Sequence, residues 1–209
     1  KIRKYIPVAA GMAGGSTDAA AVLVGVNRMF DLGFTKKELM ERGVKLGADV
    51  PYCIMRGTAL SEGIGEILTE LPAPPQCHLV IAKPQISVST KAVYGKLRVN
   101  ELAPEEHPDI DGMMAAIKNG DLDGVIERLG NVLETVTVPD HPEIAEIKEI
   151  MVENGACGSL MSGSGPTVFG IYKDRELAEK ACQALREADG GRLTRQVYLT
   201  EFYNRKKAR

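Results

Sequence analysis

The pattern of apolar and polar positions predicts helices and short strands in the first third of the chain. Residues 18–30 are apolar on nearly all sides, which predicts a buried helix. Thr35 and Glu38 form a capping box that opens a second helix over residues 36–46, and Gly47 closes it. Residues 1–6 weakly predict a strand. Short strands are predicted at residues 52–56 and 58–62, followed by a turn at residues 63–65.

A proline-rich break at residues 72–75 separates this part of the chain from a second part. We place a domain boundary there, with one domain over residues 1–72 and another over residues 76–209. Beyond the break, periodicity predicts helices at residues 90–97, 111–119, 122–134, 143–154 and 175–188. Strands are predicted at residues 77–82, 159–161, 167–172 and 196–203. Strands interleaved with helices indicate an α+β layer structure.

Length and composition are those of an ordinary globular protein. The 209 residues are 44% hydrophobic and 26% charged, and no apolar run reaches the ~20 residues that cross a bilayer. We therefore expect a soluble protein without a membrane partner. A net charge of −2 argues against a nucleic-acid partner, and the basic cluster at residues 205–209 fits a solvated tail. Oligomeric state is left open by these features.

The cysteines and histidines are too scattered for a metal centre. The four cysteines, Cys53, Cys77, Cys157 and Cys182, form no close pair, and the three histidines do not cluster. We therefore expect no metal site made by the protein. The cysteines are expected to be reduced core residues, which favours the cytoplasm.

A glycine-rich stretch near the start of the chain is the strongest candidate for chemistry. Its residues are Pro7, Val8, Ala9, Ala10, Gly11, Met12, Ala13, Gly14, Gly15, Ser16 and Thr17. A loop that approaches phosphates closely needs residues without a Cβ, so that backbone N–H groups can donate to the anion. A helix that begins at about Ser16 adds free N–H groups and the positive end of its dipole. The hydroxyls of Ser16 and Thr17 can reach a phosphate or a magnesium-bound water.

Two commoner nucleotide motifs do not fit this stretch. A Walker A motif needs a lysine directly before the Ser or Thr, and no lysine occurs between Lys4 and Lys36. The dinucleotide fingerprint Gly-x-Gly-x-x-Gly is not matched by residues 11–16. A tight strand-to-helix turn with a purely structural role stays open as an alternative.

Residues 7–20 resemble the ATP loop of the GHMP kinase superfamily, in which a proline precedes a glycine-rich run, Ser-Thr and small residues. Residues 46–51 and 160–167 resemble two further motifs of that superfamily in the same order, so the resemblance covers essentially the whole chain. It implies two domains: an N-terminal part like ribosomal protein S5 domain 2, incomplete here, and a ferredoxin-like α+β C-terminal domain. It also implies an ATP-dependent kinase whose Mg²⁺ arrives with the nucleotide.

One branch of the superfamily is especially similar to residues 47–51 and 56–66, and the likeness continues through Lys83 and Pro84. The resemblance implies phosphorylation of a hydroxyl on the methylerythritol part of a cytidine diphosphate derivative, in the non-mevalonate isoprenoid pathway. Mevalonate, homoserine or a sugar as the acceptor stays open. A nucleotide-binding module without catalysis stays open as well.

The resemblance assigns the catalytic role to Asp49. A carboxylate can accept the proton that the acceptor hydroxyl loses as the phosphoryl group arrives. A structural alternative is that Asp49 caps the turn before Pro51.

Substrate contacts are implied at two other places. Gly163, Ser164 and Gly165 match a loop over the active cleft, although a plain hairpin would suit the same glycines. Tyr94 matches an aromatic residue that stacks on the cytosine ring, an interaction worth about 1–3 kcal/mol per base in single-stranded nucleic acids. A tyrosine packed in the core is the alternative for Tyr94.

The chain begins at Lys1, directly before the ATP loop. The superfamily carries a partner lysine, adenine contacts and a histidine or aromatic residue for cytidine in a segment ahead of that loop. We expect this segment to be missing from the printed chain, which alone would then lack part of the catalytic set. Lys1 and Lys4 are not taken as replacements for the partner lysine.

Overall fold

The computed structural model describes residues 2–7 and 9–203, and these divide into two compact units. The first unit contains residues 2–7, 13–73 and 203, and the second contains residues 9–12 and 74–202. The glycine-rich stretch is therefore shared, with Ala9–Met12 in the second unit and the residues from Ala13 onward in the first. The assignment of two domains to residues 1–72 and 76–209 stays a prediction.

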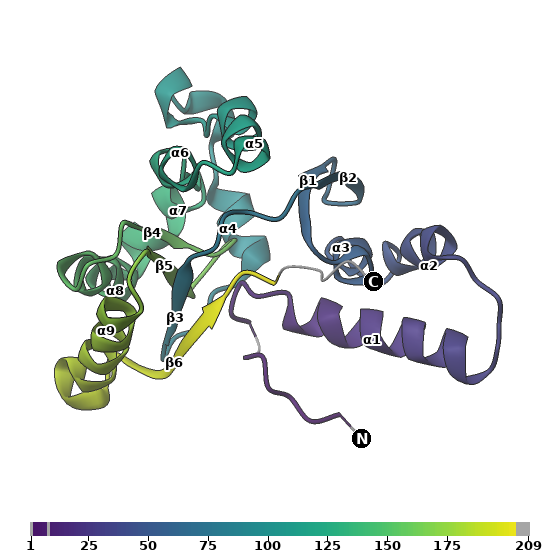
Figure 1. Ribbon diagram of the computed structural model, residues 1–209, viewed down its shortest axis with the longest axis horizontal. Helices are drawn as coiled ribbons and strands as arrows, with labels where there is room; N and C mark the ends of the chain where they lie inside the picture. The colour runs from purple at the N-terminus through teal and green to yellow at the C-terminus, as the bar shows by residue number, and fades with distance from the viewer. Residues whose placement is uncertain (1, 8, 204–209) are drawn as a thin grey trace. The chain divides into compact units, whose positions relative to one another are not determined.

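The first unit consists of three helices and a two-stranded antiparallel ribbon (Figure 1). These elements are α1 (Gly14–Met29), α2 (Lys36–Gly43), α3 (Val50–Met55), β1 (Thr58–Glu62) and β2 (Ile67–Leu71). The three helices pack around a small apolar cluster that includes Ala20, Leu39, Val50 and Ile54. The predicted capping box is confirmed, because the Thr35 hydroxyl accepts from the Glu38 amide and the Glu38 carboxylate accepts from the Thr35 amide.

Four expectations for the first unit were wrong. The helix expected over residues 36–46 ends at Gly43, a weak helix former, so Gly47 does not close it. The segment expected as a strand at residues 52–56 is helical, because Pro51 in the first turn of α3 costs that helix no hydrogen bond. A short apolar run cannot by itself distinguish a buried strand from a buried helix. Residues 2–6 of the expected first strand pair with no strand among the described residues. The strand β2 was not predicted.

The fourth error concerns the burial of α1. Its apolar residues suggested a helix covered on all sides, but only Gly14 and Ala20 of this helix are buried. Val22, Val26 and Met29 are exposed, because α2 and α3 pack against one side of α1 only.

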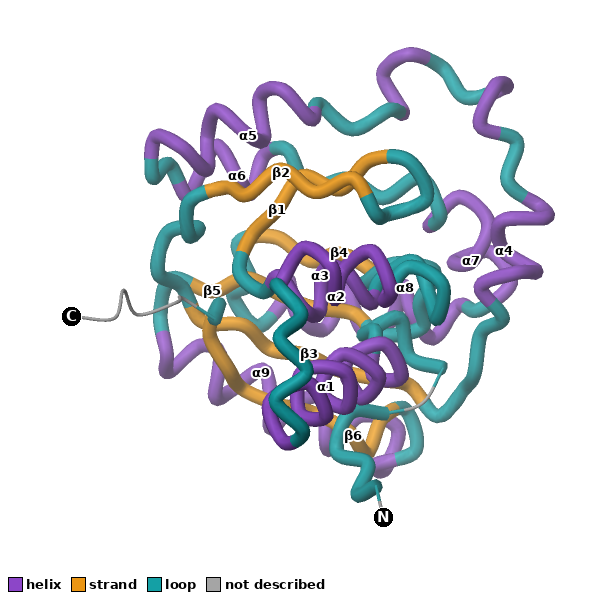
Figure 2. Tube along the Cα trace, turned by 90° about the vertical axis from the view of Figure 1, so that its right-hand side faces the viewer, coloured by secondary structure: helices purple, strands orange, loops and turns teal. Residues whose placement is uncertain are grey.

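The second unit is built on a four-stranded antiparallel sheet with the strand order β4-β5-β3-β6 (Figure 2). The strands are β3 (His78–Pro84), β4 (Gly158–Met161), β5 (Val168–Tyr172) and β6 (Thr194–Glu201), close to the predicted positions. Side chains alternate between the two faces, as expected for strands. Val80 and Ala82 join the main core, while Leu79 belongs to a separate cluster with Cys77 and Ile171.

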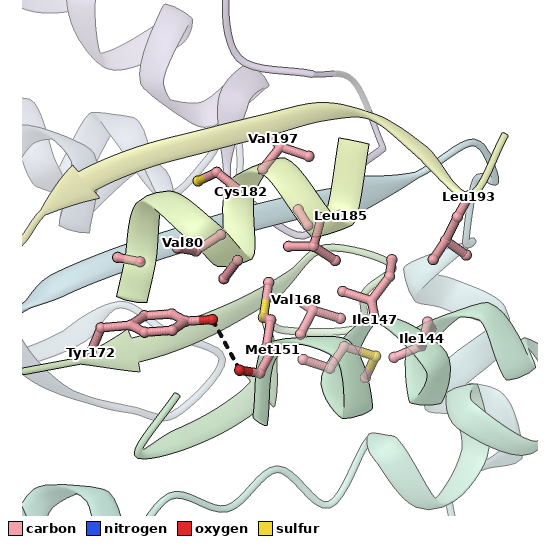
Figure 3. Packing of buried hydrophobic residues seen from close by; sticks show 14 of the residues in the cluster. Val80, Ile144, Ile147, Met151, Val168, Tyr172, Cys182, Leu185, Leu193 and Val197 are labelled. Atoms are coloured by element: carbon pink, nitrogen blue, oxygen red, sulfur yellow. Dashed lines mark hydrogen bonds between the residues drawn. The ribbon is translucent and has the colours of Figure 1, made fainter. Parts of the chain in front are cut away.

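Two helices, α8 (Pro142–Glu153) and α9 (Arg175–Glu187), cover one face of this sheet (Figures 1 and 3). Ile144, Ile147 and Leu185 from these helices are fully buried against it. Tyr172 of β5 is also fully buried, and its hydroxyl donates to the Met151 carbonyl oxygen at 3.2 Å. Burial of each large apolar side chain contributes roughly 1.5–3 kcal/mol, so this layer is the main stabilising core of the unit. The α+β expectation is confirmed.

The second unit also contains shorter helices outside this layer. They are α4 (Thr90–Lys96), α5 (Ile110–Asn119), α6 (Leu122–Glu127), α7 (Glu134–Asp140) and the short 3₁₀ turns η1 (Val99–Glu101), η2 (Pro104–Glu106) and η3 (Ala188–Gly191). The single helix expected over residues 122–134 was wrong, because α6 ends at Glu127 and α7 begins at Glu134. Gly130 and Asn131, both weak helix formers, lie in the interruption.

The cysteines are free, but they do not share one environment. Cys77 and Cys182 are buried, Cys53 is half-buried and Cys157 is exposed, so the core expectation fails for Cys157. Among the described residues, no helix is long and apolar enough to cross a membrane.

Candidate active site

The end of the glycine-rich stretch that belongs to the first unit forms the start of α1. The helix begins at Gly14, slightly earlier than expected, after Ala13 in a left-handed conformation at φ 48°. The first N–H groups of such a helix have no intrahelical partner and carry the positive end of the dipole. This is the geometry that anion binding needs.

Gly14 and Gly15 differ in what surrounds them. A Cβ on Gly14 would lie 2.9 Å from Ile6 Cγ2, so packing within the protein excludes a side chain there. A Cβ on Gly15 would meet no atom within 4 Å, and this residue is exposed. Gly15 therefore leaves open space at the helix start, where a ligand can approach the backbone.

Thr17 is held by the protein itself. Its hydroxyl donates to the Ala13 carbonyl oxygen at 3.0 Å and lies 3.5 Å from Cys53 Sγ. Burial raises the pKa of the Cys53 thiol, so the thiol stays protonated at neutral pH and acts as a weak hydrogen-bond partner. The Thr17 hydroxyl therefore already donates its hydrogen to Ala13, whereas we expected this hydroxyl to be free for a phosphate.

Asp49 follows a turn that lies beside the start of α1 in the same unit. A Cβ on Gly47 of this turn would lie 3.9 Å from Ser16 Oγ. Asp49 is the N-cap residue of α3, yet its side chain makes no capping hydrogen bond. The carboxylate is exposed and has no hydrogen-bond or ion-pair partner among the described residues. The capping alternative is therefore wrong, and the carboxylate is available for chemistry.

Of the two lysines before the glycine-rich stretch, Lys4 forms an ion pair with Asp18 of α1. The other, Lys1, lies outside the described residues, as does Val8 of the glycine-rich stretch.

The other end of the glycine-rich stretch contacts the loop between β4 and β5, within the second unit. Ser162 Oγ donates to the Gly11 carbonyl oxygen at 2.8 Å. Gly11 has φ 67°, and a Cβ there would lie 2.2 Å from the Ser162 carbonyl oxygen. Only glycine fits this position, because both the backbone conformation and the close approach exclude a side chain.

Hydrogen bonds of Ser164 hold the loop Gly163–Ser164–Gly165, the expected substrate loop, in place. Ser164 is buried, and its hydroxyl lies 2.8 Å from the hydroxyl of Thr90 on α4. The Ser164 carbonyl oxygen accepts from the Thr137 hydroxyl at 3.3 Å. Gly163 is exposed and Gly165 is buried. Of the three predicted residues, Gly163 therefore offers the accessible surface, while Ser164 holds the loop.

Tyr94 lies on the same helix as Thr90, one turn further along the chain. Its side chain is 60% exposed, so the core alternative for this tyrosine is wrong. The Thr90–Ser164 hydrogen bond joins the helix that carries Tyr94 to the loop that carries Gly163.

Sequence reasoning assigned no role to Ser162 or Thr90. Ser162 was inside the motif that carried the resemblance, but its bond to Gly11 depends on a contact across 151 positions. Within the described residues, no group of three His, Cys, Asp or Glu side chains could hold a metal ion.

Comparison with known proteins places the chain in a family. The model for the GHMP kinases N terminal domain matches residues 1–57, and the model for GHMP kinases C terminal matches residues 113–190. A 4-diphosphocytidyl-2-C-methyl-D-erythritol kinase of Lachnospira eligens is 56% identical over 97% of this chain and 68% of its own length. The chain belongs to this kinase family. The corresponding protein of Lachnoclostridium phytofermentans is 52% identical over 98% of the chain and 69% of its own length.

Solved structures agree with this assignment. A crystal structure of 4-(cytidine 5′-diphospho)-2C-methyl-D-erythritol kinase matches 95% of this chain and 68% of its own, with a TM-score of 0.78 at 30% identity. A homoserine kinase from Cytophaga hutchinsonii matches 94% of this chain and 67% of its own, with a TM-score of 0.80 at 21% identity. The latter likeness shows the fold alone. The GHMP kinase fold is thus confirmed, and family membership makes the chain a kinase that uses ATP.

Proposed function

We propose that this kinase transfers the γ-phosphoryl group of ATP to a hydroxyl of 4-diphosphocytidyl-2-C-methyl-D-erythritol, a step toward isoprenoid precursors in the non-mevalonate pathway. The observation that carries the proposal is the 56% identity, over 97% of the chain, with a relative of that name. Homoserine, mevalonate and phosphomevalonate kinases match at 10–21% identity, which supports a common fold but no common acceptor.

The glycine-rich stretch Pro7–Thr17 is the proposed phosphate site of ATP. Support comes from the free N–H groups at the start of α1 and from the open space at Gly15. Phosphoryl transfer is catalysed mainly by positioning and by electrostatic stabilisation, and backbone donors at a helix start supply both. Mg²⁺ would arrive with the nucleotide and neutralise charge on the phosphates.

Asp49 is the proposed catalytic base. An exposed carboxylate without a partner, close to the start of α1, can accept the proton of the acceptor hydroxyl as the phosphoryl group arrives. A carboxylate already used for capping or in an ion pair would be a weaker acceptor.

Tyr94 and the loop Gly163–Ser164–Gly165 are the proposed contacts for the cytidine diphosphate derivative. The exposed ring of Tyr94 offers a face on which cytosine can stack, and Gly163 offers exposed backbone on the loop that Ser164 joins to the same helix. The four free cysteines support a reducing compartment, and we propose the cytoplasm.

A panel of acceptors tests the proposal. ADP release is measured with ATP and Mg²⁺ and with 4-diphosphocytidyl-2-C-methyl-D-erythritol, mevalonate, homoserine or galactose, for the protein at the full length that its gene encodes. We expect the cytidine diphosphate derivative to be preferred by at least the ~10⁴-fold that a site built on specific polar contacts can reach. Equal or faster turnover of another acceptor would contradict the proposal. ATP binding by calorimetry without turnover of any acceptor would support the module without catalysis.

A further inference from the structure

The strand that leads into the substrate loop lies at the edge of its sheet. Among the described residues, β4 pairs only with β5, so one side of β4 presents backbone groups that no strand satisfies. Met161, the last residue of β4, is nevertheless buried to 1% exposure. Buried backbone groups need hydrogen-bond partners, so other residues must satisfy Met161 and the loop that follows it.

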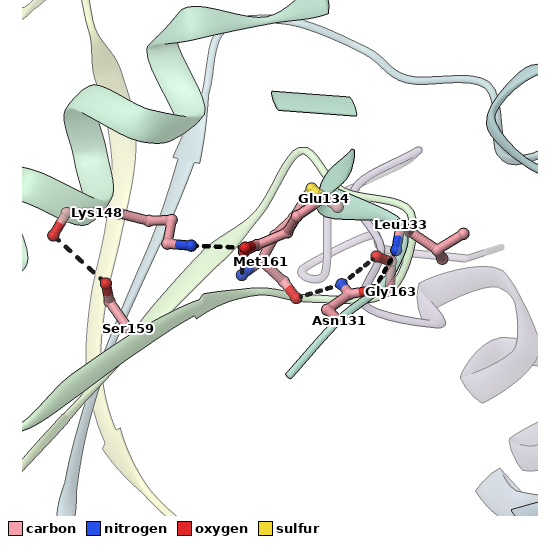
Figure 4. A network of polar contacts seen from close by, with 7 residues as sticks. All are labelled: Asn131, Leu133, Glu134, Lys148, Ser159, Met161 and Gly163. Carbon is pink, nitrogen blue, oxygen red and sulfur yellow. Dashed lines mark hydrogen bonds and ion pairs between the residues drawn. The ribbon is translucent and has the colours of Figure 1, made fainter. Parts of the chain in front are cut away.

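Three side chains, which we call the Asn131 network, meet this need: Asn131, Glu134 and Lys148 (Figure 4). The Asn131 amide nitrogen donates to the carbonyl oxygens of Met161 and Gly163, at 2.8 Å each. Its amide oxygen accepts from the Leu133 amide at 3.0 Å, which fixes the orientation of the side chain.

Glu134 and Lys148 complete the network from α7 and α8. Glu134 Oε1 accepts from the Met161 amide at 2.7 Å, and Glu134 Oε2 pairs with Lys148 Nζ at 2.6 Å. The side chains of Glu134 and Lys148 are only 19% and 26% exposed. The Met161 amide and Lys148 Nζ thus engage both carboxylate oxygens of Glu134, which restricts the orientation in which Glu134 holds Met161.

The loop that this network holds is the one that contacts Gly11. Gly163 is fixed by Asn131, and Ser162, its neighbour, donates to the Gly11 carbonyl oxygen. The backbone of the substrate loop and the tip of the glycine-rich stretch are therefore fixed by the same few side chains. None of the three members of the network needs to touch ATP or the acceptor.

We propose that Asn131, Glu134 and Lys148 are positioning residues that set the geometry of the Gly163–Ser164–Gly165 loop and, through Ser162, the place of Gly11. This inference rests on the proposed function, because it assumes that both loops bind the reactants. Displacement of a binding loop by about 1 Å can lower the rate on the order of 100-fold, even when the altered residue is remote from the chemistry.

The decisive variant is Asn131→Asp. It keeps the shape of the side chain and the acceptor for Leu133, but it removes the donor to the Met161 and Gly163 carbonyl oxygens. We expect kcat/KM for ATP and for the acceptor to fall on the order of 10- to 100-fold. The urea midpoint should fall as well, because the Met161 and Gly163 carbonyl oxygens lose their donor and face a carboxylate, so the kinetic constants are measured well below that midpoint. Hydrogen exchange at the Met161 and Gly165 amides should become faster.

Lys148→Met is a second variant, because it changes the network without touching the loop, and Lys148→Arg should restore most of the lost activity. The matched control is Lys173→Met, which breaks the ion pair of Lys173 with Asp123 elsewhere on the second unit. We expect the control to keep wild-type kcat and KM.

Wild-type kinetic constants in Asn131→Asp and Lys148→Met would overturn the inference, as would an equal loss in Lys173→Met. If the wild type turns over no acceptor, the proposed function fails. The positioning role of the Asn131 network is then tested separately, by measuring the ATP affinity of the wild type and of both variants by calorimetry. Weaker ATP binding in the two variants would support the positioning role, and unchanged binding would overturn it. If one of Asn131→Asp and Lys148→Met does not fold, the same measurements on the remaining variant carry the test.

Discussion

Ser162 donates its hydroxyl hydrogen to the Gly11 carbonyl oxygen at 2.8 Å, across 151 positions of the chain. This bond joins the tip of the glycine-rich stretch to the loop between β4 and β5. The contact explains the glycine at position 11, because a side chain there would occupy the space of the Ser162 backbone.

The first prediction concerns Gly11→Ala. The positive φ costs a residue with a side chain roughly 1–2 kcal/mol, and the 2.2 Å approach of the new Cβ to Ser162 adds to this cost. We expect a lower free energy of unfolding in urea and weaker ATP binding by calorimetry. Gly25→Ala is the matched control, because Gly25 is an exposed residue of α1 with open space around it. Alanine there should raise stability by about 0.5–1 kcal/mol. Wild-type ATP affinity and stability in Gly11→Ala would show that the loop contact is dispensable.

The second prediction concerns Asp49→Asn. The amide keeps the size of the side chain but cannot accept the proton of the acceptor hydroxyl, so kcat should fall on the order of 10²- to 10⁴-fold. Because the carboxylate has no partner to lose, the free energy of unfolding should change by less than about 0.5 kcal/mol. ATP affinity should also be retained. Glu70→Gln, at an exposed carboxylate of β2, is the control and should keep full activity. Turnover of Asp49→Asn at the wild-type rate would exclude Asp49 as the catalytic base.

The third prediction concerns Tyr94. Loss of the ring in Tyr94→Ala removes a stacking interaction of about 1–3 kcal/mol, which raises KM for the cytidine diphosphate derivative about 5- to 150-fold. KM for ATP should stay within about twofold, since a more general disturbance would affect both substrates. Tyr94→Phe keeps the ring and should behave like the wild type. If both variants bind the acceptor normally, the ring has no part in recognition.

The fourth prediction concerns the stability of the protein at alkaline pH. Burial raises the pKa of the Cys77 thiol to about 11, from an ordinary value of 9.0. In the unfolded chain this thiol ionises first, so its contribution to stability is complete below pH 9 and is lost as the pH rises toward 11. Urea unfolding between pH 7 and 10.5 should show a steeper loss of stability in the wild type than in Cys77→Ala, with a difference of roughly 1–2 kcal/mol at the alkaline end. Parallel curves for the two proteins would mean that Cys77 ionises equally in both states.

Local signals were sufficient for the parts of the fold that depend on neighbouring residues. The capping box at Thr35 and Glu38 was predicted because both partners lie within one helical turn. The strands around residues 78–84 and 168–172 were predicted from their apolar runs, the first after the proline-rich break and the second before the amphipathic helix at residues 175–188.

Elements whose state is decided by tertiary contacts were missed. The helix α3 and the interruption between α6 and α7 both involve short segments in which periodicity gives no clear answer. The same limit applies to the site. Asp49 and Gly11 could be named from a motif, but the bonds of Asn131 to Met161 and Gly163 span 30 and 32 positions and have no local signature.

The most direct test of the proposed function is the fate of the phosphoryl group. Phosphorus NMR follows ATP, Mg²⁺ and 4-diphosphocytidyl-2-C-methyl-D-erythritol with the protein at the full length that its gene encodes. We expect a new phosphomonoester resonance that grows in step with ADP, and neither product in the absence of the protein. ADP that forms together with inorganic phosphate, without a phosphomonoester on the acceptor, would contradict the proposed function.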